Sequence, residues 1–340
     1  MATSDTGSTI EVDQVDSEYE SSSYGSYEET LESINNSIHE YLYENGRRYH
    51  VYFGTDKNIL PADEMERDRL DFYHDIFLLI LHGRLHQSPI SPNPQRILDV
   101  GTGTGIWAIE MADRYPKAEV IGIDLTPIQP PWVPPNCRFE IDDVEEDWTY
   151  KSNHFDLIHV RQINQCINDW EKLCSEMYRC IKPGGYIELV EGGAVPYSDD
   201  GTMAPDNGVK VFFENLNRAL EMIGRPQPEQ NMMKARLVAA GFIDVKVLRF
   251  KQPLGAWPKD KRIKTIGSMM MVNAETAFQS YGLAAFTRIL GMSNNQAMKI
   301  CNDAYKSTTN RNNHVYKHLH IVYARKPYSH EVKDPDEVMS

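Results

Sequence analysis

The stretch that decides the fold is "ILDVGTGTGIWAIEMADRYP", residues 97–116, where three glycines separate an apolar run from an amphipathic segment. The pattern predicts a strand that ends at Val100 and a helix that begins at Gly105. Gly101 permits a sharp turn off the strand, and Gly103 lets a ligand approach the backbone. Such strand–turn–helix units receive nucleotide-like ligands in open α/β sheets, although a tight structural turn is the alternative.

Further along the chain, short apolar strands alternate with amphipathic helices. This alternation is typical of a parallel sheet that is covered by helices on both faces, so we predict the α/β class. The predicted strands are 96–100, 119–124, 137–141, 155–161 and 186–191, with closing strands in "GFIDVKVLRF" and "HVYKHLHIVYARKP", and the predicted helices are 105–115, 169–181 and 230–240.

The N-terminal region has a different composition. Residues 1–27 are rich in Ser, Asp, Glu and Tyr, and no Lys or Arg precedes Arg47. We expect a disordered acidic tail, since such a segment buries too little apolar surface to offset its ordering entropy; an acidic docking segment is the alternative.

Two helices are predicted before the first strong strand. The apolar spacing of Leu31, Ile34, Ile38 and Leu42 indicates a helix that stops at Asn45-Gly46, and a second helix opens at Pro61–Asp63. The expected domains are a tail at 1–27, an N-terminal helical cap at 28–90, a main domain at 91–327 with helical insertions near 205–235 and 258–310, and a C-terminal tail at 328–340.

Bulk composition excludes several classes of function. The 340 residues carry a net charge of −14, which disfavours binding to nucleic acid or anionic membranes. No apolar run reaches 18 residues, and the N-terminus has no secretory signal, so we expect no membrane insertion and a cytoplasmic or nuclear location. The five cysteines form no CxxC pair, which favours reduced thiols and no metal site.

Acidic residues at strand ends narrow the ligand. The glycine spacing is GxGxG, which differs from the GxGxxG of dinucleotide binders and weakens the alternative of an NAD-dependent oxidoreductase. Asp124 ends the second strand, where a carboxylate can accept hydrogen bonds from ribose hydroxyls. Asp142-Asp143 follows the third strand, where a carboxylate can accept from an adenine amino group. S-adenosylmethionine has both groups and no pyrophosphate.

Several segments resemble a known family. They are the quoted stretch, "ENGRRYHVYF", "DEMERDRLDFYHDIFLL", "IQPPWVPPNCRFEIDDVEEDWTY", "FDLIHVR", "IKPGGYIELVE" and "HLHIVYARKP". These segments are similar to class I S-adenosylmethionine-dependent methyltransferases. More narrowly, they resemble the LaeA-like methyltransferases of filamentous fungi, from about Ile34 to Pro327. The resemblance implies a Rossmann-like core of seven strands with an N-terminal helical cap.

The resemblance also implies a function in fungal secondary metabolism. One hypothesis is a methyltransferase that acts on a small metabolite or on a protein. The alternative is a cofactor-binding regulatory subunit of a nuclear complex with velvet-type proteins, which controls secondary metabolism and development. Co-purification with such partners, set against the activity of the isolated protein, discriminates the two.

Site residues follow from the same resemblance. Two of these residues also have a purely structural interpretation: Tyr49 as an aromatic packed in the cap, and Arg161 as a surface arginine past a strand end. The implied cofactor site comprises Asp99, Gly101, Gly103 and Gly105 around the methionine part, Asp124 at the ribose, Leu125, Asp143 and Val144 at the adenine, Arg161 towards the methionine end and Tyr49 closing from the cap.

No catalytic base is assigned, because the candidate histidines have simpler explanations. His159 lies within a predicted strand, where successive residues face opposite sides of the sheet, and this position indicates a packed side chain. The chain departs from the family after Arg161, where Gln162–Cys166 is more polar than expected. In the related fold this stretch faces the methyl-transfer region, so the substrate preference stays open.

Overall fold

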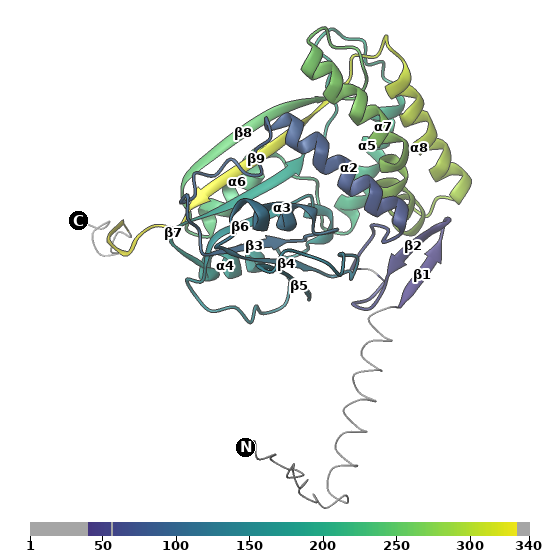
Figure 1. Ribbon diagram of the computed structural model, residues 1–340. Helices are drawn as coiled ribbons and strands as arrows, with labels where there is room; N and C mark the ends of the chain where they lie inside the picture. The colour runs from purple at the N-terminus through teal and green to yellow at the C-terminus, as the bar shows by residue number, and fades with distance from the viewer. Residues whose placement is uncertain (1–39, 56, 332–340) are drawn as a thin grey trace, which may run out of the picture. The chain divides into compact units, whose positions relative to one another are not determined.

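The computed structural model describes residues 40–55 and 57–331 and contains a seven-stranded sheet (Figure 1). Its strand order is β5–β4–β3–β6–β7–β9–β8; the first five strands are parallel, and β9 runs antiparallel between β7 and β8. The prediction of a Rossmann-like α/β fold is confirmed. The strands are β3 Arg96–Val100, β4 Glu119–Asp124, β5 Cys137–Ile141, β6 Phe155–Arg161, β7 Ile181–Gly192, β8 Ile243–Pro253 and β9 Tyr316–Arg325.

Helices cover both faces of the sheet because its strands alternate between two apolar faces. On one face, Ile97 of β3 packs in a cluster with Trp107 and Met111 of α3 (Ile106–Arg114). On the other face, Leu98 packs in a cluster that takes in α4 (Trp170–Cys180) and α6 (Gln230–Ala239).

A helical layer lies beside the sheet, where α5, α7 and α8 pack together and α2 packs on α7 (Figure 1). Its apolar cluster includes Phe77, Phe212, Phe278 and Phe286, and the strand residue Leu319. Within the insertion that the sequence predicts near 205–235, α5 packs in this layer, and α6, which begins there, packs on β8 and β9. The elements are α2 Glu64–Ile80, α5 Gly208–Met222, α7 Lys261–Ala284, the π-helical turn η2 Ala285–Ile289, α8 Asn294–Thr309, and the short turns η1 Asn164–Cys166 and η3 Ser329–Glu331.

A β-hairpin replaces the end of the first predicted helix. β1 (Tyr41–Glu44) pairs antiparallel with β2 (Arg47–His50). The prediction of helix at Leu42 is wrong, because Asn45 and Gly46 have φ of 52° and 73° and form a hairpin turn rather than a helix stop. The rest of that predicted helix, the acidic tail and residues 332–340 lie outside the described residues.

A buried carboxylate attaches the segment before β3 to the sheet. Glu188 of β7 is fully buried, and its Oε2 accepts hydrogen bonds from the backbone N–H groups of Gln87 and Ser88 at 2.8 and 2.6 Å. Burial raises the pKa of Glu188 to about 7, against the lowering effect of these two donors. The native state therefore retains a proton that the unfolded chain releases at lower pH.

This retained proton predicts the pH dependence of stability. Between about pH 4.5, the ordinary pKa of Glu, and pH 7, the native state binds more protons than the unfolded state, so the contribution of Glu188 falls as pH rises. Relative to the Glu188→Gln variant, the wild type should lose about 3 kcal/mol of unfolding free energy over this range. Urea unfolding at several pH values measures the difference. The exposed Glu171→Gln is the control, and parallel curves for wild type and Glu188→Gln would contradict the assignment.

Candidate active site

The glycine turn follows β3, where the strand order reverses between β4 and β6. Gly101, Gly103 and Gly105 have φ of 70°, 58° and 82°, in the left-handed region that favours glycine. A Cβ on Gly101 would collide with Ile163, and one on Gly105 with Phe139. A Cβ on Gly103 would make only an ordinary contact, 3.5 Å from Leu70 Cδ1, and this glycine borders an open space.

That open space is a cavity of about 1150 Å³. Three other parts of the chain complete its walls: the loop before α2, one face of α2, and α7. The residues predicted from sequence that line it are Gly101, Gly103, Asp124, Leu125, Asp143, Val144 and Arg161. Lining residues that sequence reasoning missed include Asn58, Leu60, Pro61, Leu70, Tyr73, Thr102, Thr104 and Tyr281.

Asp124 holds the turn and also faces the cavity. Its Oδ2 accepts a hydrogen bond from the N–H of Gly103 at 2.8 Å, and its Oδ1 accepts from the N–H of Thr126 at 2.9 Å. Burial raises the pKa of Asp124 to about 6, against the lowering effect of the backbone donors. Each oxygen of the ionised carboxylate retains a lone pair for a further donor.

Asp99 supports the turn from behind and does not line the cavity. Its carboxylate accepts from Thr102 Oγ1 at 2.7 Å and lies 2.8 Å from His159 Nδ1. The ring of His159 stacks on Trp107 with centroids 3.8 Å apart, and desolvation lowers the pKa of this fully buried histidine. The structure thus gives His159 the packed role that its strand position indicates.

Tyr49 and Gly105 also lie outside the cavity lining. The side chain of Tyr49 is fully buried in the apolar cluster of the helical layer, with the Arg288 guanidinium 4.5 Å from its ring centroid. It therefore has the alternative role of a packed cap aromatic. Gly105 lies against Phe139 and allows α3 to start close to β5.

Arg161 brings an available positive charge to the cavity. Among the described residues no carboxylate lies within 4.0 Å of its guanidinium; its Nη1 is 3.1 Å from His74 Nδ1, and its Cζ is 4.9 Å from the ring centroid of Phe77. Desolvation lowers the pKa of Arg161 and lowers that of His74 to about 3, so this neighbour is neutral. A guanidinium in this state favours an anionic ligand group.

Asp143 has a partner that the sequence does not reveal. Lys57 Nζ lies 2.6 Å from its carboxylate, which also accepts the N–H of Glu145 at 3.0 Å. Lys57 also pairs with Glu145 at 3.3 Å. These contacts tie the loop before α2 to the strand end of β5.

Comparison with known proteins identifies the chain. Residues 72–223 match the family model described as "Methyltransferase domain". The chain is 40% identical to methyltransferase pytC of Aspergillus terreus over 87% of this chain and 91% of pytC, and 38% identical to secondary metabolism regulator LAE1 of Cochliobolus heterostrophus over 84% and 94%. The chain belongs to the LaeA-like methyltransferase family.

Two further proteins are similar to this chain. The LaeA-like chain is 33% identical to protein-methionine methyltransferase laeA of Emericella nidulans, over 87% of this chain and 78% of that one. A solved phosphoethanolamine N-methyltransferase 2 of Haemonchus contortus superposes with a TM-score of 0.48 at 18% identity, covering 92% of this chain and 75% of its own. By family, this LaeA-like protein is an S-adenosylmethionine-dependent methyltransferase.

The cavity residues fit this cofactor. Gly103 leaves room against the backbone, Asp124 offers lone pairs, and Arg161 has no carboxylate partner among the described residues. The ribose hydroxyls of the cofactor suit the lone pairs of Asp124, and the anionic carboxylate of its methionine part suits Arg161. In residues 40–55 and 57–331, no group of three or more His, Cys, Asp or Glu side chains is placed to hold a metal ion.

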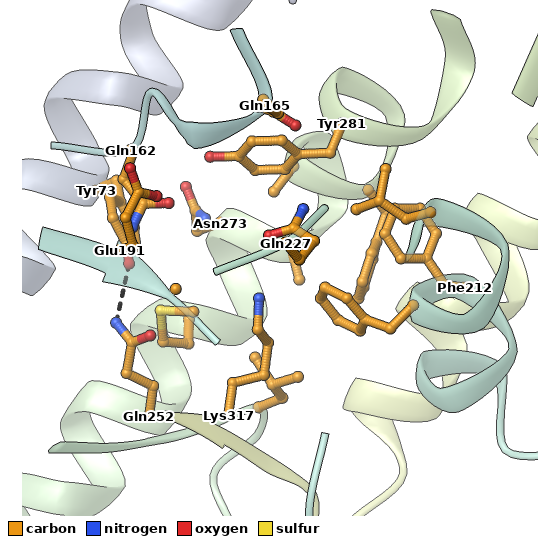
Figure 2. A pocket seen from close by; sticks show the side chains of 18 of the residues that line it. Tyr73, Gln162, Gln165, Glu191, Phe212, Gln227, Gln252, Asn273, Tyr281 and Lys317 are labelled. Carbon is orange, nitrogen blue, oxygen red and sulfur yellow. Dashed lines mark hydrogen bonds between the residues drawn. The ribbon is translucent and has the colours of Figure 1, made fainter. Parts of the chain in front are cut away.

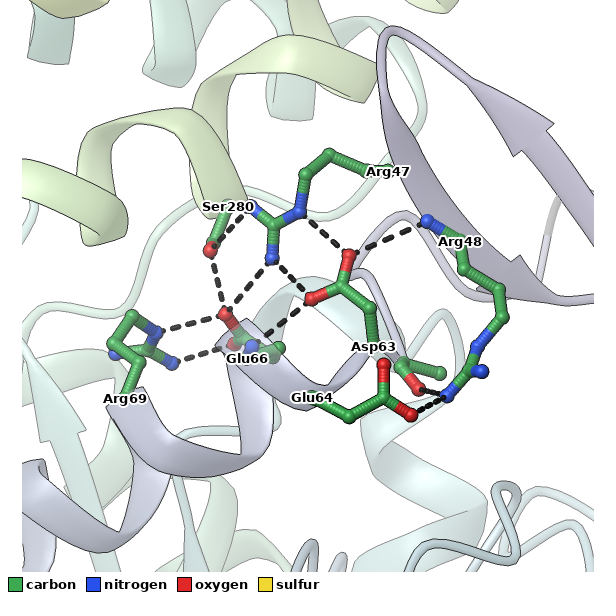
Figure 3. A network of polar contacts seen from close by, with 8 residues as sticks. Arg47, Arg48, Asp63, Glu64, Glu66, Arg69 and Ser280 are labelled. Carbon is green, nitrogen blue, oxygen red and sulfur yellow. Dashed lines mark hydrogen bonds and ion pairs between the residues drawn. The ribbon is translucent and has the colours of Figure 1, made fainter.

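A buried ion network positions the wall above the cavity (Figure 3). Arg47 of β2 pairs with Asp63, Nε to Oδ2 at 2.6 Å, and donates from Nη1 to Ser280 of α7 at 3.1 Å. Glu66 pairs with Arg69 at 2.7 Å and lies 3.7 Å from Arg47. The network joins the hairpin, α2 and α7, and both Glu66 and Arg69 line the cavity.

A second cavity, shown in Figure 2, has about 800 Å³ of empty space and shares lining residues with the first. Arg69, Tyr73, Gln162 and Tyr281 line both. Gln162 has φ of 59°, an uncommon conformation for a residue with a side chain. The polar stretch that departs from the family pattern therefore lies between the two cavities.

Gly103→Val should abolish cofactor binding with the fold retained. A β-branched side chain is strained at φ of 58° and occupies the open space of the cavity. Isothermal titration calorimetry with S-adenosylhomocysteine measures the loss. Gly201→Val is the matched control, since Gly201 has φ of 75° with no atom within 4 Å of its Cβ position, outside the cavity lining. Equal affinity in both variants would contradict the assignment of the cavity.

Arg47→Met should destabilise the protein by about 3 kcal/mol, because it leaves Asp63 without its buried cation, whereas Glu66 keeps its pair with Arg69. Arg48→Met is the control: Arg48 pairs with an exposed Glu64, and such pairs contribute about 1 kcal/mol or less. Chemical unfolding compares the two. Similar losses of unfolding free energy would show that the network does not hold the hairpin.

Proposed function

We propose that the protein binds S-adenosylmethionine in the first cavity and methylates an acceptor in the second, within fungal secondary metabolism. The observation that carries this proposal is the junction of the two cavities at Arg69, Tyr73, Gln162 and Tyr281. A donor site and an acceptor site that share a wall bring the reacting atoms together, and such positioning supplies roughly 7–11 kcal/mol of barrier reduction in favourable cases.

The residues at the strand ends of the first cavity have distinct binding roles. Asp124 accepts from the ribose hydroxyls, Leu125 and residues 142–144 border the adenine, and Arg161 holds the methionine carboxylate. Asp99 positions the turn through Thr102. S-adenosylmethionine, when bound, supplies a methyl group that is already activated on a sulfonium centre.

The junction residues orient the acceptor and exclude water. Burial raises the pKa of Tyr73 to about 12, so its hydroxyl keeps its proton at neutral pH. This hydroxyl accepts a hydrogen bond from Gln252 Nε2 at 3.0 Å, which leaves its own O–H available to an acceptor molecule. Tyr73 is therefore a donor that orients the acceptor, rather than a base.

The relatives' names support the metabolic setting. They include a methyltransferase, a protein-methionine methyltransferase and secondary metabolism regulators. In the regulatory form of this proposal, the protein has a velvet-type partner and a nuclear location. Co-purification from a fungal extract tests this form. No helix in the described residues is long and apolar enough to cross a membrane.

The role of Arg161 can be tested with two ligands that differ at the amino-acid end. S-adenosylhomocysteine carries the carboxylate and ammonium of this end, and 5′-methylthioadenosine has a methyl group in their place. Arg161→Met should weaken S-adenosylhomocysteine at least tenfold, the range of a charged hydrogen bond, with 5′-methylthioadenosine unchanged. Asp124→Ala should weaken both ligands.

Calorimetry measures all four affinities, and Asp147→Ala, at a carboxylate outside the cavity lining, is the control. Equal losses for the two ligands in Arg161→Met would place the arginine elsewhere on the ligand. Failure of the wild type to bind S-adenosylhomocysteine would refute the proposed function.

A further inference from the structure

The second cavity has an apolar side that suits a flat molecule. Phe212, Phe213 and Leu216 of α5 and Met270 and Phe278 of α7 line it, and the rings of Phe212 and Phe278 are in edge contact with centroids 4.7 Å apart. These walls favour a compact acceptor of low polarity.

The opposite side carries buried polar atoms without partners in the described part of the chain. They are Gln162 Nε2, Gln165 Oε1 and Asn273 Oδ1. An unpaired polar atom in a desolvated site is destabilising, so most such atoms are paired in folded proteins. A ligand with donors and acceptors on one edge would satisfy these three atoms.

Lys317 adds a positive charge to this side. It comes from β9, and in Figure 2 its amino group points towards Gln227 and Asn273. The nitrogen lies 4.0 Å from the ring centroid of Phe213, and no carboxylate of the described residues lies within 4.0 Å of it. Desolvation lowers the pKa of Lys317 to about 8, against the raising effect of Glu191.

Glu191 does not neutralise this charge. Its Oε1 accepts from the N–H groups of Ile163 and Asn164 at 2.9 and 3.0 Å, which engages it with the polar loop after β6. Burial raises the pKa of Glu191 to about 8, against the lowering effect of these two backbone donors. Lys317 lies in the cavity with no carboxylate of the described residues within 4.0 Å, so an entering anion would supply the ion pair that it lacks.

The position of Lys317 links it to the junction of the cavities. A Cβ on Gly192 would lie 3.5 Å from Lys317 Nζ and 3.7 Å from Gln162 Nε2, so both groups border the space above this glycine. Gln162 lines both cavities. A ligand group that contacts Lys317 is thus next to the residue that separates acceptor from cofactor.

We propose that the acceptor is a small, flat, largely apolar molecule with an anionic oxygen, and that Lys317 binds this oxygen while Phe212 and Phe213 pack on the apolar body. The inference rests on the proposed methyltransferase function and names its substrate class. Lys317 is a specificity-determining residue here.

Two naphthalene probes test the charge preference. 2-Naphthoate has a carboxylate on a flat apolar body, and 2-naphthamide is its neutral isostere. Wild-type protein should bind 2-naphthoate at least tenfold more tightly than 2-naphthamide, measured by fluorescence with and without S-adenosylhomocysteine. Lys317→Met should remove this preference, and Lys317→Arg should restore it in part.

Matched variants locate the binding site. Lys246→Met changes an exposed lysine of β8 and should keep the preference. Ala274→Phe fills the cavity from α7 and should weaken both probes, whereas Val272→Phe, exposed on the same helix, should not. S-adenosylhomocysteine affinity and the melting temperature establish that each variant is folded.

Three results would overturn the inference: no preference for 2-naphthoate in the wild type, a preference that survives in Lys317→Met, or unchanged binding in Ala274→Phe. These outcomes are separate from a failure of the proposed function, which would appear as absent S-adenosylhomocysteine binding in the wild type. Because the probes are measured without cofactor as well, each failure can be assigned to one proposal.

Discussion

The buried carboxylate of Asp99 is the interaction on which the site depends. It lies in the middle of the sheet at the end of β3, and it binds Thr102 of the glycine turn on one side and His159 of β6 on the other. The turn adopts three left-handed glycine conformations, which have little side-chain packing of their own. A carboxylate that joins turn and sheet therefore sets the path of the backbone, and Asp124 then fixes Gly103 from the neighbouring strand.

Charged residues at the carboxyl ends of three parallel strands lie around the first cavity. Asp124 follows β4, residues 142–144 follow β5, and Arg161 ends β6, because parallel strands present their carboxyl ends at one edge of the sheet. The negative groups and the guanidinium thus lie on different sides of the glycine turn. This arrangement suits a ligand with hydroxyls at one end and a carboxylate at the other.

The helical layer adds the second cavity. Tyr281 and Asn273 come from α7, Phe212 from α5 and Lys317 from β9, so three segments that are distant in sequence meet at this cavity. The ion network of Arg47, Asp63, Glu66 and Arg69 holds this layer to the hairpin and to α2 (Figure 3). Since Arg69 lines both cavities, the network also sets the wall between them.

The sequence alone determined the α/β core and the placement of Asp124, Leu125 and Arg161 at strand ends, because strand periodicity and turn chemistry act over a few residues. Only the tertiary structure decided what depends on distant partners. It packed Tyr49 among the helices, paired Lys57 with Asp143 and brought Lys317 beside Gln162. These contacts join residues far apart in sequence, so no local pattern of side chains records them.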